Sequence, residues 1–152
     1  MKVMEPRRKT RRTRGQALAE MGLVILLFTT ITLAIIDFGR MLMILNVITH
    51  ATRDSARQAA VIPSSQFGVG NLSGAGFTAV KSRLQTQLET VLTSGDASAL
   101  ANSLVVSRVA GGAAGDMVQA TVTGPVPFLF AFPGLWGGDV DVNRVATFRF
   151  EG

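Results

Sequence analysis

The sequence predicts a membrane-anchored α+β protein with a long N-terminal helix, a second short helix and a small antiparallel sheet of about three strands. Three observations predict this class. Residues 21–36 form an uncharged apolar run, no proline interrupts the chain from Gln16 to Ile62, and the last third alternates apolar with polar residues. Helix interiors exclude proline, and alternation with a period of two is typical of strands that bury one face.

We expect four segments along the chain. These are a basic leader over residues 1–15, a long helix over 16–62 that spans the membrane at about 17–36, a loop rich in glycine and serine over 63–76, and a small extracytoplasmic α+β domain over 77–152. Such an order is typical of a protein held in a membrane by its N-terminal helix.

The positive charge of the chain is concentrated in the leader. Residues 1–15 carry seven lysine or arginine residues and one glutamate, a charge of +6, whereas the whole chain has a net charge of +5. The remainder is therefore slightly acidic. Nucleic-acid binding requires basic residues clustered on a folded face, so we expect no nucleic-acid partner. A basic segment beside an apolar helix instead keeps the N-terminus cytoplasmic and sends the C-terminal part across.

The apolar run has the length and flanks of a membrane span. Counted from Ala17, it reaches the ~20 residues that cross a bilayer. A cleaved secretory signal would need a small-residue site after the run, and Ile35 to Arg40 provide none. A lipoprotein signal needs a cysteine, which the chain lacks, and the longer twin-arginine motif is missing. A permanent, unprocessed signal anchor stays open as the alternative.

The long helix is expected to continue well beyond the membrane. It would extend about 70 Å, more than twice a hydrocarbon core of about 30 Å, so that half of it stands outside. The outer half is amphipathic, with Asp54 placed to meet Arg57 one turn on. A stripe of small side chains at four-residue spacing permits close approach of another element: Ala51, Ser55 and Ala59.

A loop and a shorter helix are expected next. Pro63 ends the long helix, and glycine and serine are frequent from there to Gly76. The glycine spacing matches neither a phosphate-binding nor a dinucleotide-binding loop. Apolar residues then recur every three or four positions from Phe77 to near Gly95, which predicts the second helix.

The C-terminal third predicts the sheet. A hairpin is expected from Leu104 to Val122 around a glycine-rich turn, and a last strand from Val140 to Phe150. Arg144 breaks the alternation of that strand, which indicates a bulge or a partner contact. Residues 125–136 form an unusually apolar loop, which either covers the core as a flap or contacts a neighbouring subunit or the membrane. Its possible interface residues are Phe128, Phe130, Phe132 and Trp136.

The composition argues against an enzyme. With one histidine, no cysteine and no tyrosine, a conventional metal cluster or thiol nucleophile is not expected. His50, Asp54 and Ser55 point around one helix, whereas the members of a catalytic triad converge on one substrate atom. We therefore expect no catalytic residue, no metal site and no cofactor. A membrane-tethered enzyme would require a pocket under the apolar loop and also a cluster of three carboxylates: Asp116, Asp139 and Asp141.

The segment RGQALAE, from Arg14 to Glu20, has the form of a prepilin-type processing site. Gly15 ends the basic leader, and a carboxylate follows five residues later at the start of the apolar helix. Cleavage after Gly15 would create an α-amine on Gln16, four residues before Glu20 and on the same helical face. A neighbouring subunit's amine could pair with this carboxylate during assembly, because an unpaired carboxylate in the membrane is costly. The alternative is a glutamate that snorkels to the headgroups.

Together with the segment IDFGRMLMILNVITHATRDSARQAAV, this motif resembles the TadE-like pseudopilins of tight-adherence (Tad, or Flp) pilus systems. The resemblance runs from about Arg14 to Val61 and continues more loosely into the loop PVPFLFAFPGLWGG and the last strand. It implies that Gly15 is the last leader residue, Gln16 the new N-terminus and Glu20 the pilin-type glutamate. It also implies two recurring helix motifs, which are Asp37, Phe38, Gly39 and Arg40, and then Arg53, Asp54, Ser55, Ala56 and Arg57.

This resemblance implies a minor pilin or pseudopilin that a prepilin peptidase processes and that acts in pilus assembly for adhesion or secretion. The implied partners are that peptidase, other pilins or pseudopilins, an inner-membrane assembly platform and membrane lipids. The implied location is the inner membrane, in a single pass with a cytoplasmic N-terminus and an extracytoplasmic C-terminal domain. The alternative is an unprocessed single-span envelope protein whose outer domain binds a partner in another export or adhesion machine.

Overall fold

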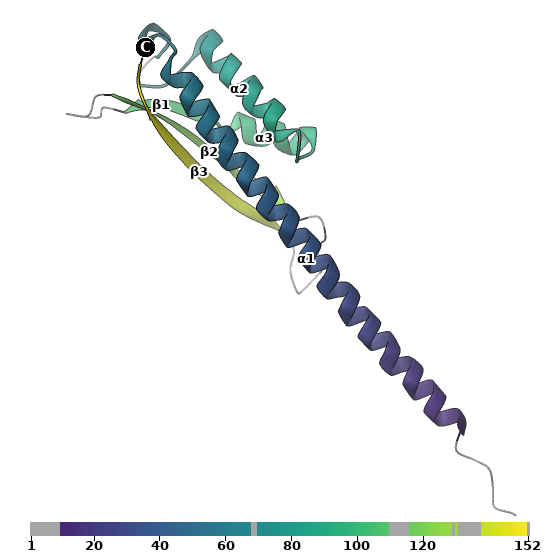
Figure 1. Cartoon of the computed structure of the whole chain (residues 1–152). Coiled ribbons are helices and arrows are strands. Elements are labelled where there is room, and N and C mark those ends of the chain that lie inside the picture. Colours follow the sequence, from purple (N-terminus) through teal and green to yellow (C-terminus); the bar gives the residue numbers. More distant parts are fainter. Residues whose placement is uncertain (1–9, 68–69, 110–115, 129, 131–137, 152) are drawn as a thin grey trace, which may run out of the picture. The chain divides into compact units, whose positions relative to one another are not determined.

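The computed structural model describes residues 10–67, 70–109, 116–128, 130 and 138–151. Its elements (Figure 1) are α1 (Thr10–Ala60), a short 3-10 helix η1 (Ser64–Gln66), α2 (Gly74–Leu88), α3 (Ser94–Asn102), β1 (Val105–Val109), β2 (Met117–Pro127) and β3 (Asp139–Arg149). The predicted α+β class is confirmed: a long N-terminal helix is followed by further short helices and a three-stranded antiparallel sheet. The chain divides into two compact units, Met1–Phe38 and Gly39–Gly152, and the second is called the head below.

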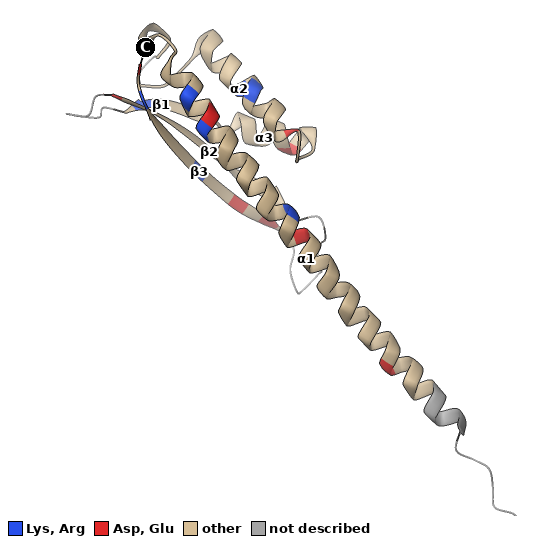
Figure 2. Cartoon of the chain, viewed as in Figure 1, with Lys and Arg blue, Asp and Glu red and all other residues tan. Residues whose placement is uncertain are grey.

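The first unit contains the apolar part of α1. No charged residue occurs between Glu20 and Asp37 (Figure 2). The hydroxyls of Thr30 and Thr32 each donate to a backbone carbonyl four residues earlier, at 2.8 Å, so these polar groups are satisfied within the helix. Only 6% of the most apolar window of the helix is buried in the protein. This helix is long and apolar enough to cross a membrane.

The head is built on an antiparallel sheet in the order β1-β2-β3. On the central strand, Ala120 lies opposite Val106 of β1 and Ala146 of β3. The strands bury alternate side chains on one face: Val106, Val118, Ala120, Val122, Val126, Val142 and Ala146. After β3, the Glu151 amide donates to the carbonyl of Ala60, the last residue of α1, at 2.9 Å. The end of the chain is thus joined to the end of its first helix.

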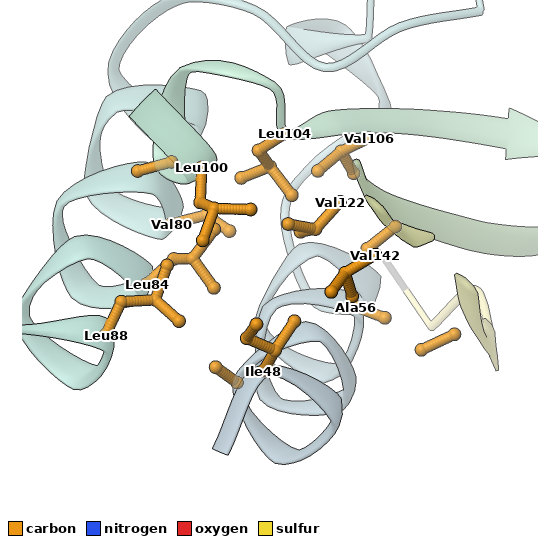
Figure 3. Close-up of a cluster of buried hydrophobic side chains, with 14 of the residues drawn as sticks. Ile48, Ala56, Val80, Leu84, Leu88, Leu100, Leu104, Val106, Val122 and Val142 are labelled. Atoms are coloured by element: carbon orange, nitrogen blue, oxygen red, sulfur yellow. The ribbon is translucent and has the colours of Figure 1, made fainter. Parts of the chain in front are cut away.

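Three helices complete the core of the head. Figure 3 shows side chains from the C-terminal part of α1, from α2 and from α3 pointing toward those of the sheet. The largest of these helix side chains are at most 2% exposed: Ile44, Ile48, Val80, Leu84, Leu88 and Leu100. Because they leave water almost completely, they supply the main hydrophobic stabilisation of the head.

The predicted stripe of small side chains on α1 lies inside this core. Ala51 and Ser55 are 2% exposed, and Ala59 is fully buried. The Ser55 hydroxyl donates to the Ala51 carbonyl at 2.8 Å, so it brings no unsatisfied polar group into the interior. Small side chains here allow the helix backbone to lie close to its neighbours.

The segment predicted as a single second helix forms two helices. α2 ends at Leu88, and α3 begins at Ser94 after a short turn. The Thr93 side chain caps α3 by accepting from the Asp96 amide at 3.3 Å. A capped N-terminus satisfies backbone donors that a continuous helix would bond internally. The expectation of one helix reaching Gly95 was therefore wrong.

β2 runs through two prolines that the sequence placed in the apolar loop. In an antiparallel sheet, successive residues of a strand direct their backbone groups to opposite sides. The Thr123 amide donates to the Ser103 hydroxyl, so it points away from β3. Pro125 and Pro127 share this parity, so their missing N–H groups would point away from β3. β1 pairs with β2 only as far as Thr121, so neither proline removes a ladder bond.

Arg144 does not mark a bulge. The register of β2 and β3 is continuous, with Arg144 directly opposite Val122. The side chain of Arg144 reaches α1, where its Nε donates to the Thr49 hydroxyl at 3.2 Å. The arginine on the buried parity of the strand thus makes a polar contact between sheet and helix.

Candidate functional site

The residues of the predicted processing site lie on α1. Gly15, Gln16 and Glu20 are all exposed. The Gln16 side-chain amide donates to the Glu20 carboxylate at 3.1 Å, which shows that the two residues share one helical face. A Cβ added at Gly15 would meet no atom within 4 Å. The glycine is therefore not required by packing within this chain.

The first helix motif of the resemblance spans the boundary between the two units. In the first unit, Asp37 is 2% exposed and Phe38 is 63% exposed. In the head, Gly39 is surrounded by open space, since an added Cβ would meet no atom within 4 Å. Arg40 is half-buried and its guanidinium donates to the Pro127 carbonyl at 3.4 Å. Arg40 thus ties α1 to the end of β2, where the apolar loop begins.

The second helix motif contributes a polar contact to the head. The Asp54 carboxylate pairs with the Arg83 guanidinium of α2 at 3.2 Å and accepts from the side-chain amides of Gln58 and Gln87 at 2.9 and 3.0 Å. The sequence suggested Arg57 as its partner. The Arg57 guanidinium instead lies over the Phe148 ring of β3, 6.0 Å from its centroid. Asp54 therefore links α1 to α2.

Replacing Asp54 with alanine is expected to lower the free energy of unfolding by about 1–2 kcal/mol, because one carboxylate serves three donors at a partly exposed site. Hydrogen exchange of the α2 amides in the full chain, held in detergent micelles, measures this loss. Arg53→Ala is the matched control, since Arg53 is the exposed neighbour on the same helix. Its effect should stay within about 0.5 kcal/mol. Equal effects of the two variants would contradict a linking role for Asp54.

A shallow depression of about 440 Å³ lies beside Asp54. It is lined by residues of α1 and by residues of α2 and the turn after it: Val47, His50, Ala51, Asp54, Gln87 and Thr90. His50 is exposed. Within the described ranges, no group of three or more histidine, cysteine, aspartate or glutamate residues could hold a metal ion.

The three carboxylates that a membrane-tethered enzyme would require do not cluster. Asp139 and Asp141 lie opposite Pro127 and Pro125 at one end of the β2–β3 ladder. Asp116 precedes β2 at the other end. Eleven residues of strand separate the two ends, about 35 Å at the usual rise per residue. The cluster of three carboxylates that the enzyme hypothesis required is therefore not formed.

Asp116 belongs to a contact that sequence reasoning missed. The Arg108 Nε donates to its carboxylate at 2.8 Å, and the Arg108 guanidinium lies 4.3 Å from the centroid of the Phe150 ring. Phe150 in turn meets Phe67 edge to face, with ring centroids 5.7 Å apart. These residues are far apart in sequence and carry no shared motif, so a pattern could not have identified them. They fasten the loop before α2 to the sheet.

The aromatic residues of the apolar loop are only partly described. Phe128 and Phe130 are half-buried, and Phe128 packs against the hydrophobic core. Phe132 and Trp136 lie outside the described residues. Phe128 therefore fits the flap interpretation, and an interface role for the four aromatic residues stays a prediction.

Comparison with known proteins finds one family that the N-terminal helix resembles. Residues 15–57 match the family model described as TadE-like protein, which leaves the rest of the head outside the match. No match was found among curated proteins or solved structures. The matched segment begins at Gly15 and includes Glu20 and both helix motifs. That family is associated with the Tad pilus and is structural rather than enzymatic in kind, and over residues 15–57 the chain is similar to it.

Proposed function

We propose that this protein is a minor pilin or pseudopilin that a prepilin peptidase cleaves after Gly15 and that acts in assembly of a Tad/Flp-type pilus for adhesion or secretion. The observation that carries the proposal is the start of the family match at Gly15, just before the apolar part of α1, which the protein leaves unburied. A helix of this kind is suited to lipid or to the helices of other subunits.

Cleavage would allow the contact between Gln16 and Glu20 within one chain to be replaced by a contact between subunits. In the intact chain, the Gln16 amide occupies the Glu20 carboxylate at 3.1 Å. After cleavage, Gln16 carries a free α-amine, and the Glu20 carboxylate becomes the partner for the amine of a neighbouring subunit. Such a pair in an apolar environment enforces register, because displacement leaves two unpaired charges. The partners in this account are the prepilin peptidase, other pilins or pseudopilins, the inner-membrane assembly platform and membrane lipids.

The position in the membrane follows from charge and hydropathy. The basic leader favours a cytoplasmic N-terminus, and the span then delivers the head to the extracytoplasmic side of the inner membrane. The outer half of α1 lies in the core of the head, so anchoring and folding use one continuous helix. Incorporation into the filament and a priming role at its base are both compatible with this arrangement.

One observation favours the alternative of an unprocessed single-span envelope protein. α1 begins at Thr10 and continues through Gly15 without a break, so the proposed cleavage site lies within helical backbone. A peptidase would have to unwind or fray the first turns of α1 before cutting. A permanent signal anchor would require no such step.

Replacing Gly15 with leucine is expected to abolish cleavage and to leave the chain at its full length. The test is the intact mass and the N-terminal sequence of the protein purified from its native membrane. Cleavage of the wild-type chain would give a protein that begins at Gln16. Because an added Cβ meets nothing at Gly15, loss of cleavage in the variant would not reflect a packing defect within the chain.

Gly22→Leu is the matched control for this experiment. Gly22 lies on the same helix, and its added Cβ also meets nothing within 4 Å. The control should be cleaved like the wild type, because it is beyond the processing site. A wild-type protein that keeps the leader would contradict the proposal and favour the permanent anchor.

A further inference from the structure

β3 forms an edge of the sheet whose outward backbone groups are identifiable from the register. The Phe150 amide donates to the Asp116 carbonyl at 2.9 Å, directly across the ladder. Bonded pairs alternate along an antiparallel ladder, so the even-numbered residues of β3 bond to β2. The odd-numbered residues therefore direct their N–H and C=O groups away from the sheet. They are Asp139, Asp141, Asn143, Val145, Thr147 and Arg149.

The opposite edge of the sheet, formed by β1, is covered by another segment of the chain. On β1, the Val106 carbonyl accepts from the Leu72 amide at 2.9 Å, and the Arg108 amide donates to the Gly70 carbonyl at 2.6 Å. The segment before α2 thus covers that edge. At the β3 edge, the Arg144 guanidinium donates to the Asn143 carbonyl at 3.3 Å, and just after the strand the Glu151 amide donates to the Ala60 carbonyl at 2.9 Å. Among the described residues, no other segment bonds to the outward backbone groups of β3, so this edge is open over the length of the strand.

The open edge is long and regular. β3 has eleven residues, pairs with β2 without a bulge and contains neither proline nor glycine. All six odd-numbered side chains are exposed, including Val145 at 53%. Proteins usually protect an edge strand by shortening, bending or covering it. The protection that the exposed side of β3 offers consists of charged side chains alone. Asp139 and Asp141 lie at one end of the strand, and Arg149 lies at the other.

We propose that the β3 edge binds an extended segment of a different protein chain, which adds a fourth strand to the sheet. The segment is cationic where it meets Asp139 and Asp141 and anionic where it meets Arg149. Backbone bonds to the odd-numbered residues supply affinity, and the cross-strand charge pairs supply register and direction.

The charge pattern argues against a second copy of this chain as the partner. β3 is self-complementary only in the antiparallel direction, which places Asp139 opposite Arg149. Copies anchored in one membrane present β3 in the same direction, a step that rests on the membrane anchoring in the proposed function. Parallel pairing in register would place like charges beside each other at both ends, which is destabilising.

The first test is binding of two synthetic peptides to the intact chain in detergent micelles, measured by fluorescence anisotropy. The matched peptide has eleven residues that alternate threonine and valine, with glutamate at position 1 and lysine at positions 9 and 11. Antiparallel to β3, it places these charges opposite Arg149, Asp141 and Asp139. The second peptide has glutamate at all three positions, which places a like charge opposite Asp139 in either strand direction. We expect it to bind about tenfold more weakly. Equal affinities, or no binding of the matched peptide, would overturn the proposal.

A backbone variant tests the edge itself. Val145→Pro removes an outward N–H and leaves the β2 ladder intact, whereas Val145→Ala shortens the side chain and keeps the N–H. We expect the proline variant to lose binding of the matched peptide and the alanine variant to keep it. Hydrogen exchange of the β2 amides checks that the head remains folded, and Thr147→Pro with Thr147→Ala repeats the comparison at the next outward position.

The remaining outcomes are also decisive. Undiminished binding in both folded proline variants would place the peptide elsewhere and overturn the proposal. Self-association of the intact chain that the proline variants abolish would assign the edge to a second copy, against the charge argument. Since the peptide assay uses the uncleaved chain, its result does not depend on whether Gly15 is processed.

Discussion

Replacing Glu20 with leucine is expected to reduce co-assembly with other pilus subunits about 100-fold or more, while cleavage after Gly15 continues. The variant removes the carboxylate that would receive the amine of a neighbouring subunit. Removing one member of a buried ion pair costs about 3–5 kcal/mol, because the other charge is left without a partner. The measurement is the amount of other pilins that co-purifies with the protein from its native membrane, by quantitative mass spectrometry.

Glu89→Leu provides a control with the same local contact. Glu89 accepts from the side-chain amide of Gln85, four residues earlier, at 2.9 Å, as Glu20 accepts from Gln16 at 3.1 Å. Glu89 follows α2 in the head and is exposed. Its replacement should leave co-assembly unchanged. If Glu20→Leu assembled as well as Glu89→Leu, Glu20 would be a glutamate that snorkels to the headgroups, with no role in pairing.

Replacing Ile48 with alanine is expected to lower the free energy of unfolding of the head by about 2–5 kcal/mol. Ile48 is fully buried on α1, where it contributes to the core between the helices and the sheet (Figure 3). Truncation removes apolar contacts and leaves a cavity that a closely packed core fills only in part. Hydrogen exchange of the β2 amides in the full chain reports the loss, because these amides open only when the head unfolds.

Leu42→Ala is the corresponding control on the same helix. Leu42 is 47% exposed, so its truncation removes fewer contacts and creates no enclosed cavity. It should cost less than about 1 kcal/mol. Equal exchange rates in the two variants would show that the outer half of α1 is not part of the folded core.

The elements that follow a clear period were predictable from the sequence. α1 lacks proline and carries one long apolar run, and the strands alternate buried and exposed residues. The break between α2 and α3 was harder to predict, because Val91 and Leu92 continue the apolar pattern of α2. The signal present was Thr93 followed three residues later by Asp96, which is the spacing of a helix cap.

Other features depend on tertiary pairing. The sequence pattern placed Pro125 and Pro127 in a loop. The register shows instead that their missing N–H groups would face a side of β2 where no strand is paired among the described residues. The partner of Asp54 lies on α2 at Arg83, beyond the reach of local spacing. The proposed processing segment differs, because Gly15 and Glu20 lie five residues apart on one helix. The placement of the candidate site residues on one helix was therefore predictable from sequence, whereas most contacts within the head were not.

The bond between the Glu151 amide and the Ala60 carbonyl bears on the order of synthesis. The buried face of α1 is made first, and the strands that cover it follow about 90 residues later. At roughly 5–20 residues per second, Ile44 and Ile48 wait on the order of ten seconds for their neighbours. During that interval the nascent helix exposes apolar side chains that the later strands cover. The strands must therefore be made before the first helix reaches its final surroundings.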